Sequence, residues 1–274
     1  MKIKNNAVFY LVITAVLWSS GGVMIKWVDW NPIAVAGMRS LIAAIVIGVA
    51  FRDEKLSFSW PQWLGAAAYC ITMVLFVMAT KLTTAANAIL LQYTAPIYVA
   101  LLGQWLLKEP VSRRDWITVI LVFGGMVLFF FDKVTSGGLL GNFLAIVSGI
   151  SFAVFIVCMR MQKAAAPYGT VFLGNICTFL VSLPFLTNLS LNFGNVGAIL
   201  YLGLFQLGFA YVLYSKAIRQ VNALEAILIT SIEPILNPVW VVVFLGEAPG
   251  KFALIGGIIV VGAVIMRSFR RQLQ

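Results

Sequence analysis

The chain has 274 residues, of which 62% are hydrophobic and only 10% are charged, and its mean hydropathy is +1.00. A soluble domain is typically about 25% charged, so this composition excludes a soluble globular protein and indicates an integral membrane protein. The net charge of +10 gives no reason to expect a nucleic-acid partner, because the basic residues gather in short loops between apolar stretches.

Ten apolar stretches are long enough to cross a bilayer, which needs about 20 mostly apolar residues per helix. They lie at 7–28, 33–51, 62–80, 84–107, 114–131, 138–159, 168–186, 196–217, 222–246 and 252–267. We interpret the first stretch as a retained helix, because it is too long for the apolar part of a signal peptide. The connections are too short for a soluble catalytic domain. We therefore predict an all-α membrane protein with ten transmembrane helices.

The basic residues predict the orientation of these spans. With ten spans, both termini lie on one side, and that side holds fourteen basic residues: Lys2, Lys4, Arg52, Lys55, Lys108, Arg113, Arg114, Arg160, Lys163, Lys216, Arg219, Arg267, Arg270 and Arg271. The other side holds only Lys26, Lys81, Lys133 and Lys251. Because cytoplasmic loops carry the excess of Lys and Arg, we expect cytoplasmic termini and a location in the inner or plasma membrane.

The residue types argue against an enzyme, a metal centre and a cofactor. The chain has no histidine, no Asp/Glu pair at a useful spacing and no glycine-rich phosphate loop, so the usual parts of a catalytic site are missing. The three cysteines, Cys70, Cys158 and Cys177, fall inside spans without paired spacing, which favours neither a disulfide nor a thiolate metal site.

An internal repeat becomes visible when residues 87–109 are placed over residues 225–247 without a gap. Identical residues then meet at Ala88, Ile89, Leu90, Pro96, Ile97, Leu107 and Glu109. A repeat of five spans enters the membrane from opposite sides in its two copies, so we predict an inverted repeat with halves at 1–134 and 135–274. Inverted repeats are typical of secondary transporters, whose substrate site lies near the midplane between the halves.

Prolines interrupt the fourth and ninth spans at equivalent positions. Proline has no backbone N–H, so Pro234 leaves the carbonyl of Thr230 without its helical donor, and Pro96 does the same to Gln92. Pro238 adds a second interruption to the ninth span. Such carbonyls are tolerated in a bilayer only where the backbone is buried in protein or lines a wet cavity. We expect both breaks to face each other across a central cavity; a structural kink satisfied by neighbouring groups is the alternative.

Charged residues inside spans are costly, and they mark functional sites by default. Glu233 lies near the middle of the ninth span, and Arg39 lies about two turns inside the second. The residues Glu225, Ile229, Glu233 and Asn237 recur at four-residue steps, so they share one broad face of the ninth span. Two alternatives remain open. Glu225 could simply occupy a helix N-terminus, where an acidic residue is favoured, and Arg39 could be a structural counter-ion or extend to the interface.

Polar and aromatic residues in other spans complete the candidate substrate site. The full set of predicted substrate-binding residues is Trp18, Ser19, Arg39, Tyr69, Asn87, Gln92, Tyr93, Tyr98, Gln206, Tyr211, Glu225, Glu233 and Asn237. Glu233 is also the candidate for proton coupling, because the chain has no histidine.

Several long motifs resemble the EamA domain of the drug/metabolite transporter superfamily. The first half contains "AVLWSSGGVMIK" at 15–26, Pro32 followed by "AGMRSL", and "LTTAANAILLQYTAPIYVALLGQWLLKEPVSRRDWITVILVFGGMVL" at 82–128. The second half contains "VNALEAILITSIEPILNPVWVVVFLGEAPGKFALIGGIIVVGAVIM" at 221–266. The resemblance covers nearly the whole chain. It implies ten helices in two inverted five-helix repeats, cytoplasmic termini and a central cavity bordered by the fourth and ninth helices.

The resemblance also implies movement of small metabolites, often by export. We therefore expect a secondary active transporter for a small molecule such as an amino acid or other zwitterion, embedded in membrane lipid and compatible with proton coupling and with a homodimer. A multidrug or organic-cation exporter is the first alternative and a lipid-carrier flippase the second. The small multidrug exporters of the superfamily use a glutamate in their first helix, which this chain lacks.

Overall fold

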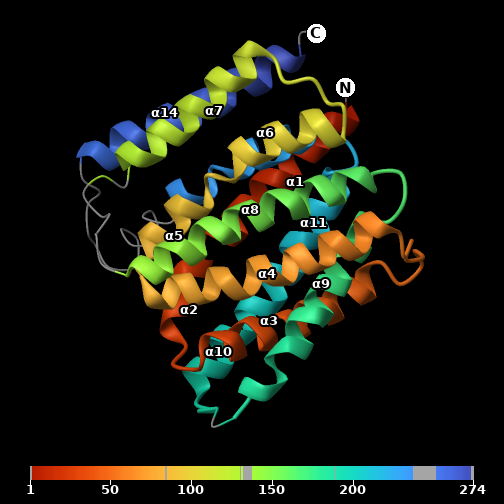
Figure 1. Ribbon diagram of the computed structural model, residues 1–274, viewed down its shortest axis with the longest axis vertical. Coiled ribbons are helices and arrows are strands. Elements are labelled where there is room, and N and C mark those ends of the chain that lie inside the picture. Colours follow the sequence, from red (N-terminus) through yellow and green to blue (C-terminus); the bar gives the residue numbers. More distant parts are fainter. Residues whose placement is uncertain are drawn as a thin grey trace.

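The computed structural model describes residues 2–83, 85–129, 131, 138–187, 189–236 and 251–272. Over these ranges the chain is helical and contains no β-strand, which confirms the predicted all-α class. The helices run side by side along one common direction, and α1 begins at the same end of the bundle at which α14 finishes (Figure 1).

Each predicted span of the first half corresponds to one helix or to two consecutive helices. They are α1 (Lys2–Ser19), α2 (Gly21–Trp27), α3 (Pro32–Ala50), α4 (Trp60–Leu82), α5 (Ala85–Gln92), α6 (Ala95–Leu106) and α7 (Arg113–Phe129). Prolines at the first positions start α3, α4 and α6, where a residue without an N–H is tolerated. Asn31 caps α3, since its side chain accepts a hydrogen bond from the Ile33 N–H at 2.9 Å.

The predicted spans of the second half likewise correspond to one helix or to several consecutive helical elements. Its elements are α8 (Leu139–Met161), α9 (Pro167–Ser182), the short 3₁₀ turn η1 (Leu183–Phe185), α10 (Phe193–Tyr201), the π-helical segment η2 (Leu202–Phe209), α11 (Ala210–Ala217), α12 (Ala223–Thr230) and α14 (Lys251–Gln272). The part of the predicted ninth span beyond residue 236, including Asn237 and Pro238, lies outside the described residues.

Seven helices of the described residues are long and apolar enough to cross a membrane. They are Asn6–Trp27, Pro32–Ala50, Trp60–Leu82, Asn87–Leu106, Leu139–Met161, Pro167–Phe185 and Phe193–Ala217. The apolar part of α14, Leu254–Met266, is shorter, and α7 has 17 residues. These helices coincide with predicted spans, although the described residues do not establish the full count of ten.

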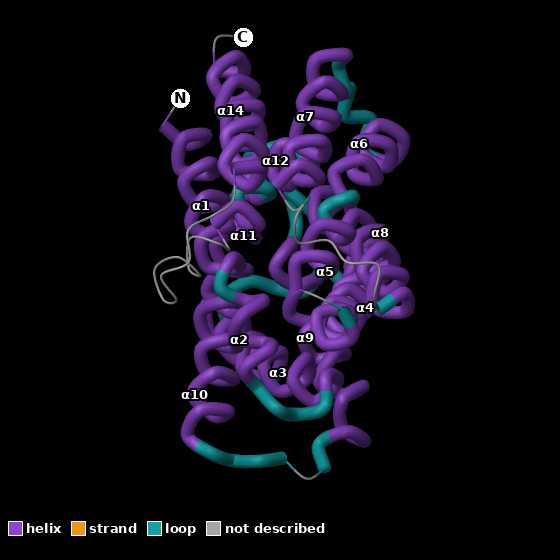
Figure 2. Tube along the Cα trace, turned by 90° about the vertical axis from the view of Figure 1, so that its left-hand side faces the viewer, coloured by secondary structure: helices purple, strands orange, loops and turns teal. Residues whose placement is uncertain are grey.

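Helices from the two halves pack against each other in pairs. α4 packs along α8 and α1 along α11, while α3 packs on α9 and α7 on α14 (Figure 1). The α7–α14 pair lies at one edge of the bundle in both views (Figure 2). When the five predicted spans of each half are matched in chain order, α1 corresponds to α8 and α4 to α11, so the α4–α8 pair corresponds to the α11–α1 pair. The same matching pairs α3 with α9 and α7 with α14, so each of these two contacts corresponds to itself.

Small residues allow the closest of these contacts. A Cβ atom added to Gly37 of α3 would lie 1.7 Å from Oγ of Ser182 at the end of α9. The Ser182 hydroxyl is held in place, because it donates to the Phe179 carbonyl at 2.7 Å. A bilayer provides little hydrophobic drive for helix association, so close approach at small residues contributes much of the packing energy.

We predict that Gly37→Ala destabilises the protein by about 1–3 kcal/mol, because the added methyl group forces α3 and α9 apart. The measurement is the melting temperature of the purified protein in mild detergent. Gly262→Ala is the matched control, since a Cβ atom at Gly262 meets nothing within 4 Å. An equal loss of stability in both variants would contradict close packing at Gly37.

Candidate functional site

A small cavity lies at the centre of the bundle, where elements of both halves meet. Its lining residues are Trp18, Arg39, Thr72, Met73, Phe76, Gln92, Phe152, Gln206, Leu207, Tyr211 and Glu233. Its volume of about 30 Å³ has room for about two water molecules. Two waters contain fewer heavy atoms than the smallest amino acid, so the cavity as it stands is too small for a metabolite.

Arg39 is the most unusual residue of this cavity. Its side chain is 1% exposed, although it carries a permanent positive charge. Its two terminal nitrogens approach Oε1 of Gln206 at 3.4 Å and the sulfur of Met73 at 3.6 Å, while its Nε has no partner. None of the carboxylates in the described part of the chain forms an ion pair with it. A buried charge normally has a counter-ion, so the site provides unused capacity for an anionic group.

Gln206 reaches Arg39 from the π-helical segment η2. Segments of π-helix are rare and occur often at functional sites. Gly21, at the start of α2, makes room for the glutamine, because a Cβ atom there would lie 2.8 Å from Nε2 of Gln206. Gly203 lets η2 approach α3 closely, and a Cβ atom at this position would lie 3.0 Å from the Arg39 carbonyl oxygen. The local backbone of η2 thus positions a neutral amide beside the guanidinium.

Aromatic rings form one wall of the cavity. Trp18 of α1 contacts Tyr211 and Tyr214 of α11, with ring centroids 5.1 and 5.5 Å away, and Phe152 of α8 at 6.0 Å. The indole Nε1 of Trp18 is buried without a hydrogen-bond partner in the described residues, and so is the Tyr214 hydroxyl. The wall therefore combines a large apolar surface with unused polar atoms, which suits a ligand that has an apolar part.

Glu233 lies on another wall, immediately before Pro234. Its Oε2 is 2.5 Å from the hydroxyl oxygen of Tyr93, which lies in the turn between α5 and α6. The same hydroxyl is 3.0 Å from the Thr230 carbonyl oxygen. The breaks of the fourth and ninth spans are thus in direct contact. Pro96 and Pro234 are both buried, and neither faces the outer surface of the bundle.

An ion-pair network ties the helices together at the end where α1 begins. Nε of Arg160, at the end of α8, is 2.7 Å from Oε1 of Glu109. Arg160 also donates to the Ile218 carbonyl at 2.9 Å, and Glu109 accepts from the Ala223 N–H at 3.1 Å. Arg219 pairs with Glu54 in the loop before α4. This network holds the α11–α12 turn against the first half.

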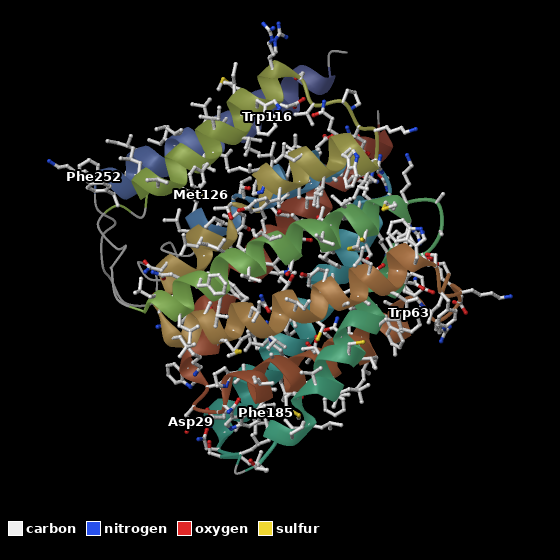
Figure 3. All side chains as sticks on the ribbon, viewed as in Figure 1. Asp29, Trp63, Trp116, Met126, Phe185 and Phe252 are labelled. Atoms are coloured by element: carbon white, nitrogen blue, oxygen red, sulfur yellow. The ribbon has the colours of Figure 1, made fainter. Side chains whose placement is uncertain are left out.

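Polar contacts connect the halves at the opposite end as well. Figure 3 shows Asp29 at the end of the molecule away from Trp63. Asp29 accepts from the Ser190 hydroxyl at 2.5 Å and also from the side chain of Asn195. The hydrogen bond from Ser190 is the main reason why the pKa of Asp29 is lowered from its usual value. The Lys81 ammonium group donates to the Val28 carbonyl, which anchors the same loop to α4.

The structure brings six of the thirteen predicted binding residues to the cavity: Trp18, Arg39, Gln92, Gln206, Tyr211 and Glu233. Six others lie elsewhere, namely Ser19, Tyr69, Asn87, Tyr93, Tyr98 and Glu225, and Asn237 lies outside the described residues. Tyr69 donates to Asn175, and Asn87 to Asn142, both at 3.1 Å. Ser19 donates to the Val16 carbonyl, and Glu225 occupies the first turn of α12. The sequence alone does not show whether a polar side chain bonds to another residue of the protein or lines a cavity.

Five lining residues were absent from the prediction: Thr72, Met73, Phe76, Phe152 and Leu207. Four of them are apolar, and because membrane spans consist mostly of apolar residues, the sequence does not show which of these line a cavity. Thr72 is polar, but its hydroxyl donates to the Ala68 carbonyl one turn earlier at 2.7 Å. Only the packing of α4, α8 and η2 against the other helices places these residues in the site.

The family model described as "EamA-like transporter family" matches this chain at residues 5–131 and again at residues 139–269. The chain belongs to the EamA-like transporter family. It is therefore a multi-pass membrane transporter of a small molecule and not an enzyme.

Individual relatives of this EamA-like protein are distant. An uncharacterized transporter of Archaeoglobus fulgidus is 27% identical, over 96% of this chain and 97% of that protein. Human solute carrier family 35 member G1 is 23% identical, over 97% of this chain and 80% of that protein. One solved crystal structure covers 98% of this chain and 99% of its own, with a TM-score of 0.82 and 17% identity. That likeness shows the fold alone.

We predict that Arg160→Leu lowers the stability of this EamA-like transporter by about 3 kcal/mol, because it leaves Glu109 without its charge partner at a nearly buried site. The side chains of the pair are only 9% and 18% exposed. Thermal unfolding in detergent measures the effect. Arg52→Leu is the control, since the Arg52–Asp53 pair is 78% and 91% exposed and contributes little. Equal melting temperatures for Arg160→Leu and wild type would contradict this role.

Proposed function

We propose that this protein is a secondary active transporter that exports a small zwitterionic metabolite, such as an amino acid, across the cell membrane by alternating access. The observation that carries the proposal is the buried guanidinium of Arg39, which has no carboxylate partner among the described residues. A substrate carboxylate would supply the missing counter-ion. A substrate amino group would lie toward Glu233, which lines the same cavity.

The proposed architecture has two inverted halves, residues 1–134 and 135–274, with both termini in the cytoplasm. The packing supports this proposal, because the helix pairs are preserved when the two halves are exchanged. The cavity receives residues from α1, α3, α4 and α5 of the first half, and from α8, η2 and α11 of the second. A site of this kind opens to either side when one half tilts against the other.

The size of the cavity supports a cycle of opening and closing. The cavity of about 30 Å³ has room for about two water molecules, which is too little for an amino acid, while polar contacts join the halves at both ends of the bundle. In the proposed cycle, separation at the Glu109–Arg160 end admits substrate from the cytoplasm. Separation at the Asp29–Asn195 end then releases it outside. Each opening breaks only a few hydrogen bonds between the halves, so in the proposed cycle neither the cytoplasm-open nor the outside-open state is strongly favoured.

Export of an organic cation is the second candidate. The aromatic wall around Trp18 and the carboxyl group of Glu233 favour it, because aromatic faces and carboxylates attract cations. Arg39 opposes it, since a second positive charge in the same small cavity repels a cation. The balance of these interactions favours the zwitterion, whose two charges match both groups.

We predict that amino acids raise the melting temperature of the purified transporter, because a ligand that binds only the folded protein stabilises it by about 2.7 kcal/mol at 100 times its Kd. A screen of amino acids, amines, sugars and nucleotides would identify the class. Arg39→Met, which keeps an apolar stem but removes the charge, should abolish the shift for amino acids. Stabilisation by lipophilic cations alone, unchanged in Arg39→Met, would instead support the second candidate.

We further predict that Glu233→Gln abolishes the pH dependence of uptake into proteoliposomes. Glutamine keeps the shape of the side chain but cannot bind and release a proton. The substrate is the amino acid identified by the screen, and Asp53→Asn serves as the control, because the Asp53 side chain is 91% exposed and does not line the cavity. Full retention of pH-driven uptake in Glu233→Gln would reject Glu233 as the coupling group.

A further inference from the structure

The broken part of the ninth span has an unusual hydrogen-bond arrangement. In a regular helix the N–H of residue 234 would donate to the Thr230 carbonyl, but Pro234 has no N–H. The hydroxyl group of Tyr93 lies 3.0 Å from this carbonyl oxygen, in a buried position. The donor that the ninth span lacks is therefore supplied by the fourth span, across the interface between the two halves.

The same hydroxyl is also 2.5 Å from Oε2 of Glu233. A tyrosine hydroxyl has one hydrogen, and it can donate to only one of these two oxygens at a time. Both contacts are hydrogen bonds at once only if Glu233 is protonated. Its carboxyl group then donates to the Tyr93 oxygen, and Tyr93 donates to the Thr230 carbonyl.

We propose that Tyr93 is a positioning residue that transmits the protonation state of Glu233 to the proline break of the ninth span. When Glu233 is protonated, the chain from Glu233 through Tyr93 to Thr230 satisfies the broken backbone. When Glu233 loses its proton, the Tyr93 hydroxyl turns to the carboxylate, since a charged acceptor is the stronger one. The Thr230 carbonyl then lacks a partner, and the break rearranges or opens to water.

Other charged and titratable groups around Glu233 come from helices of both halves. In the described residues they are Arg39 of α3 and Tyr211 of α11, in addition to Tyr93 itself. Arg39 lines the same cavity as Glu233, but no ion pair joins these two residues in the described part of the chain. The Tyr93 hydroxyl, which contacts the carboxyl group directly, is therefore the group that responds to the protonation state of Glu233.

Among the described residues, the break in the fourth span shows no equivalent relay. Position 93 corresponds to Ser231 in the second half, and the Ser231 hydroxyl donates to the Ile227 carbonyl of its own helix at 2.8 Å. The Gln92 carbonyl, which Pro96 leaves without a donor, packs instead against Gly149 of α8, where a Cβ atom would lie 2.7 Å away. Both spans are therefore broken by a proline, but in the described part of the chain an acidic residue is joined to the break of the ninth span and not to that of the fourth.

A double-mutant cycle read by hydrogen–deuterium exchange tests this relay, which rests on the proposed proton-coupled transport. The probe is the exchange of backbone amides in the peptide covering residues 227–236, at one alkaline pH, in the full-length protein in detergent. Glu233→Gln mimics the protonated acid, because its amide N–H can donate to Tyr93. We expect it to slow exchange about fivefold, the factor that corresponds to one ordinary hydrogen bond.

In the Tyr93→Phe background, Glu233→Gln should leave the exchange rate unchanged, because the link to Thr230 is gone. Tyr98→Phe is the matched control in the same predicted span, since Tyr98 is half-buried and lies outside the relay. With this control, the fivefold effect should persist. Equal slowing by Glu233→Gln with and without the Tyr93 hydroxyl would overturn the proposal, and so would the absence of slowing in the parent protein.

Infrared difference spectra between acidic and alkaline pH give a second measurement if a doubly substituted protein fails to fold. The wild type should show a protonated-carboxyl band that is lost in Glu233→Gln and is accompanied by a change in a tyrosine band. In Tyr93→Phe the carboxyl band should move to higher frequency, because the acid has lost its acceptor. A carboxyl band that stays unchanged would overturn the relay. Neither measurement depends on transport, so a failed relay is distinguishable from a failed transport assignment.

Discussion

The requirement that every backbone polar group in a bilayer be satisfied within the protein governs this structure. Unbroken helices meet it by themselves, but the breaks at Pro96 and Pro234 do not. Their free carbonyls force these segments into the protein interior, where the neighbouring helices can satisfy or shield them. The Tyr93 hydroxyl does so for the ninth span, and close packing on Gly149 shields the fourth. The need to satisfy the backbone thus brings both breaks to the centre of the bundle.

The charged groups of the protein divide into two kinds that differ in their partners. Arg160 and Arg219 sit at the end of the bundle and have carboxylate partners and carbonyl acceptors, as structural charges do. Arg39 lies in the centre with only weak contacts to Gln206 and Met73. A buried charge without a partner destabilises the folded protein, so stability alone does not account for Arg39. Its position in the cavity that Trp18 and Glu233 also line is what the proposed substrate carboxylate would account for.

Rigid contacts and weak contacts are also distributed unevenly. The α3–α9 interface is closely packed at Gly37, whereas the two ends of the bundle are held by polar contacts in the loops. Close packing transmits motion as a rigid body, while hydrogen bonds near water exchange readily for solvent. In the alternating-access cycle proposed above, this distribution lets helical units tilt about the central site, and the small cavity is one stage of that motion.

The membrane class, the positions of most spans and the two proline breaks are predictable from the sequence, because length, hydropathy and proline chemistry are local properties. Arg39 and Glu233 are predictable as well, since a charge inside an apolar span is conspicuous. In contrast, the packing of the helices explains why Phe152 and Met73 line the cavity while Tyr69 and Asn87 do not, because apolar residues and local hydrogen bonds leave no distinguishing signal in the sequence. The contact of Tyr93 with Thr230 joins positions 137 residues apart, and only the packing of the two halves brings them together.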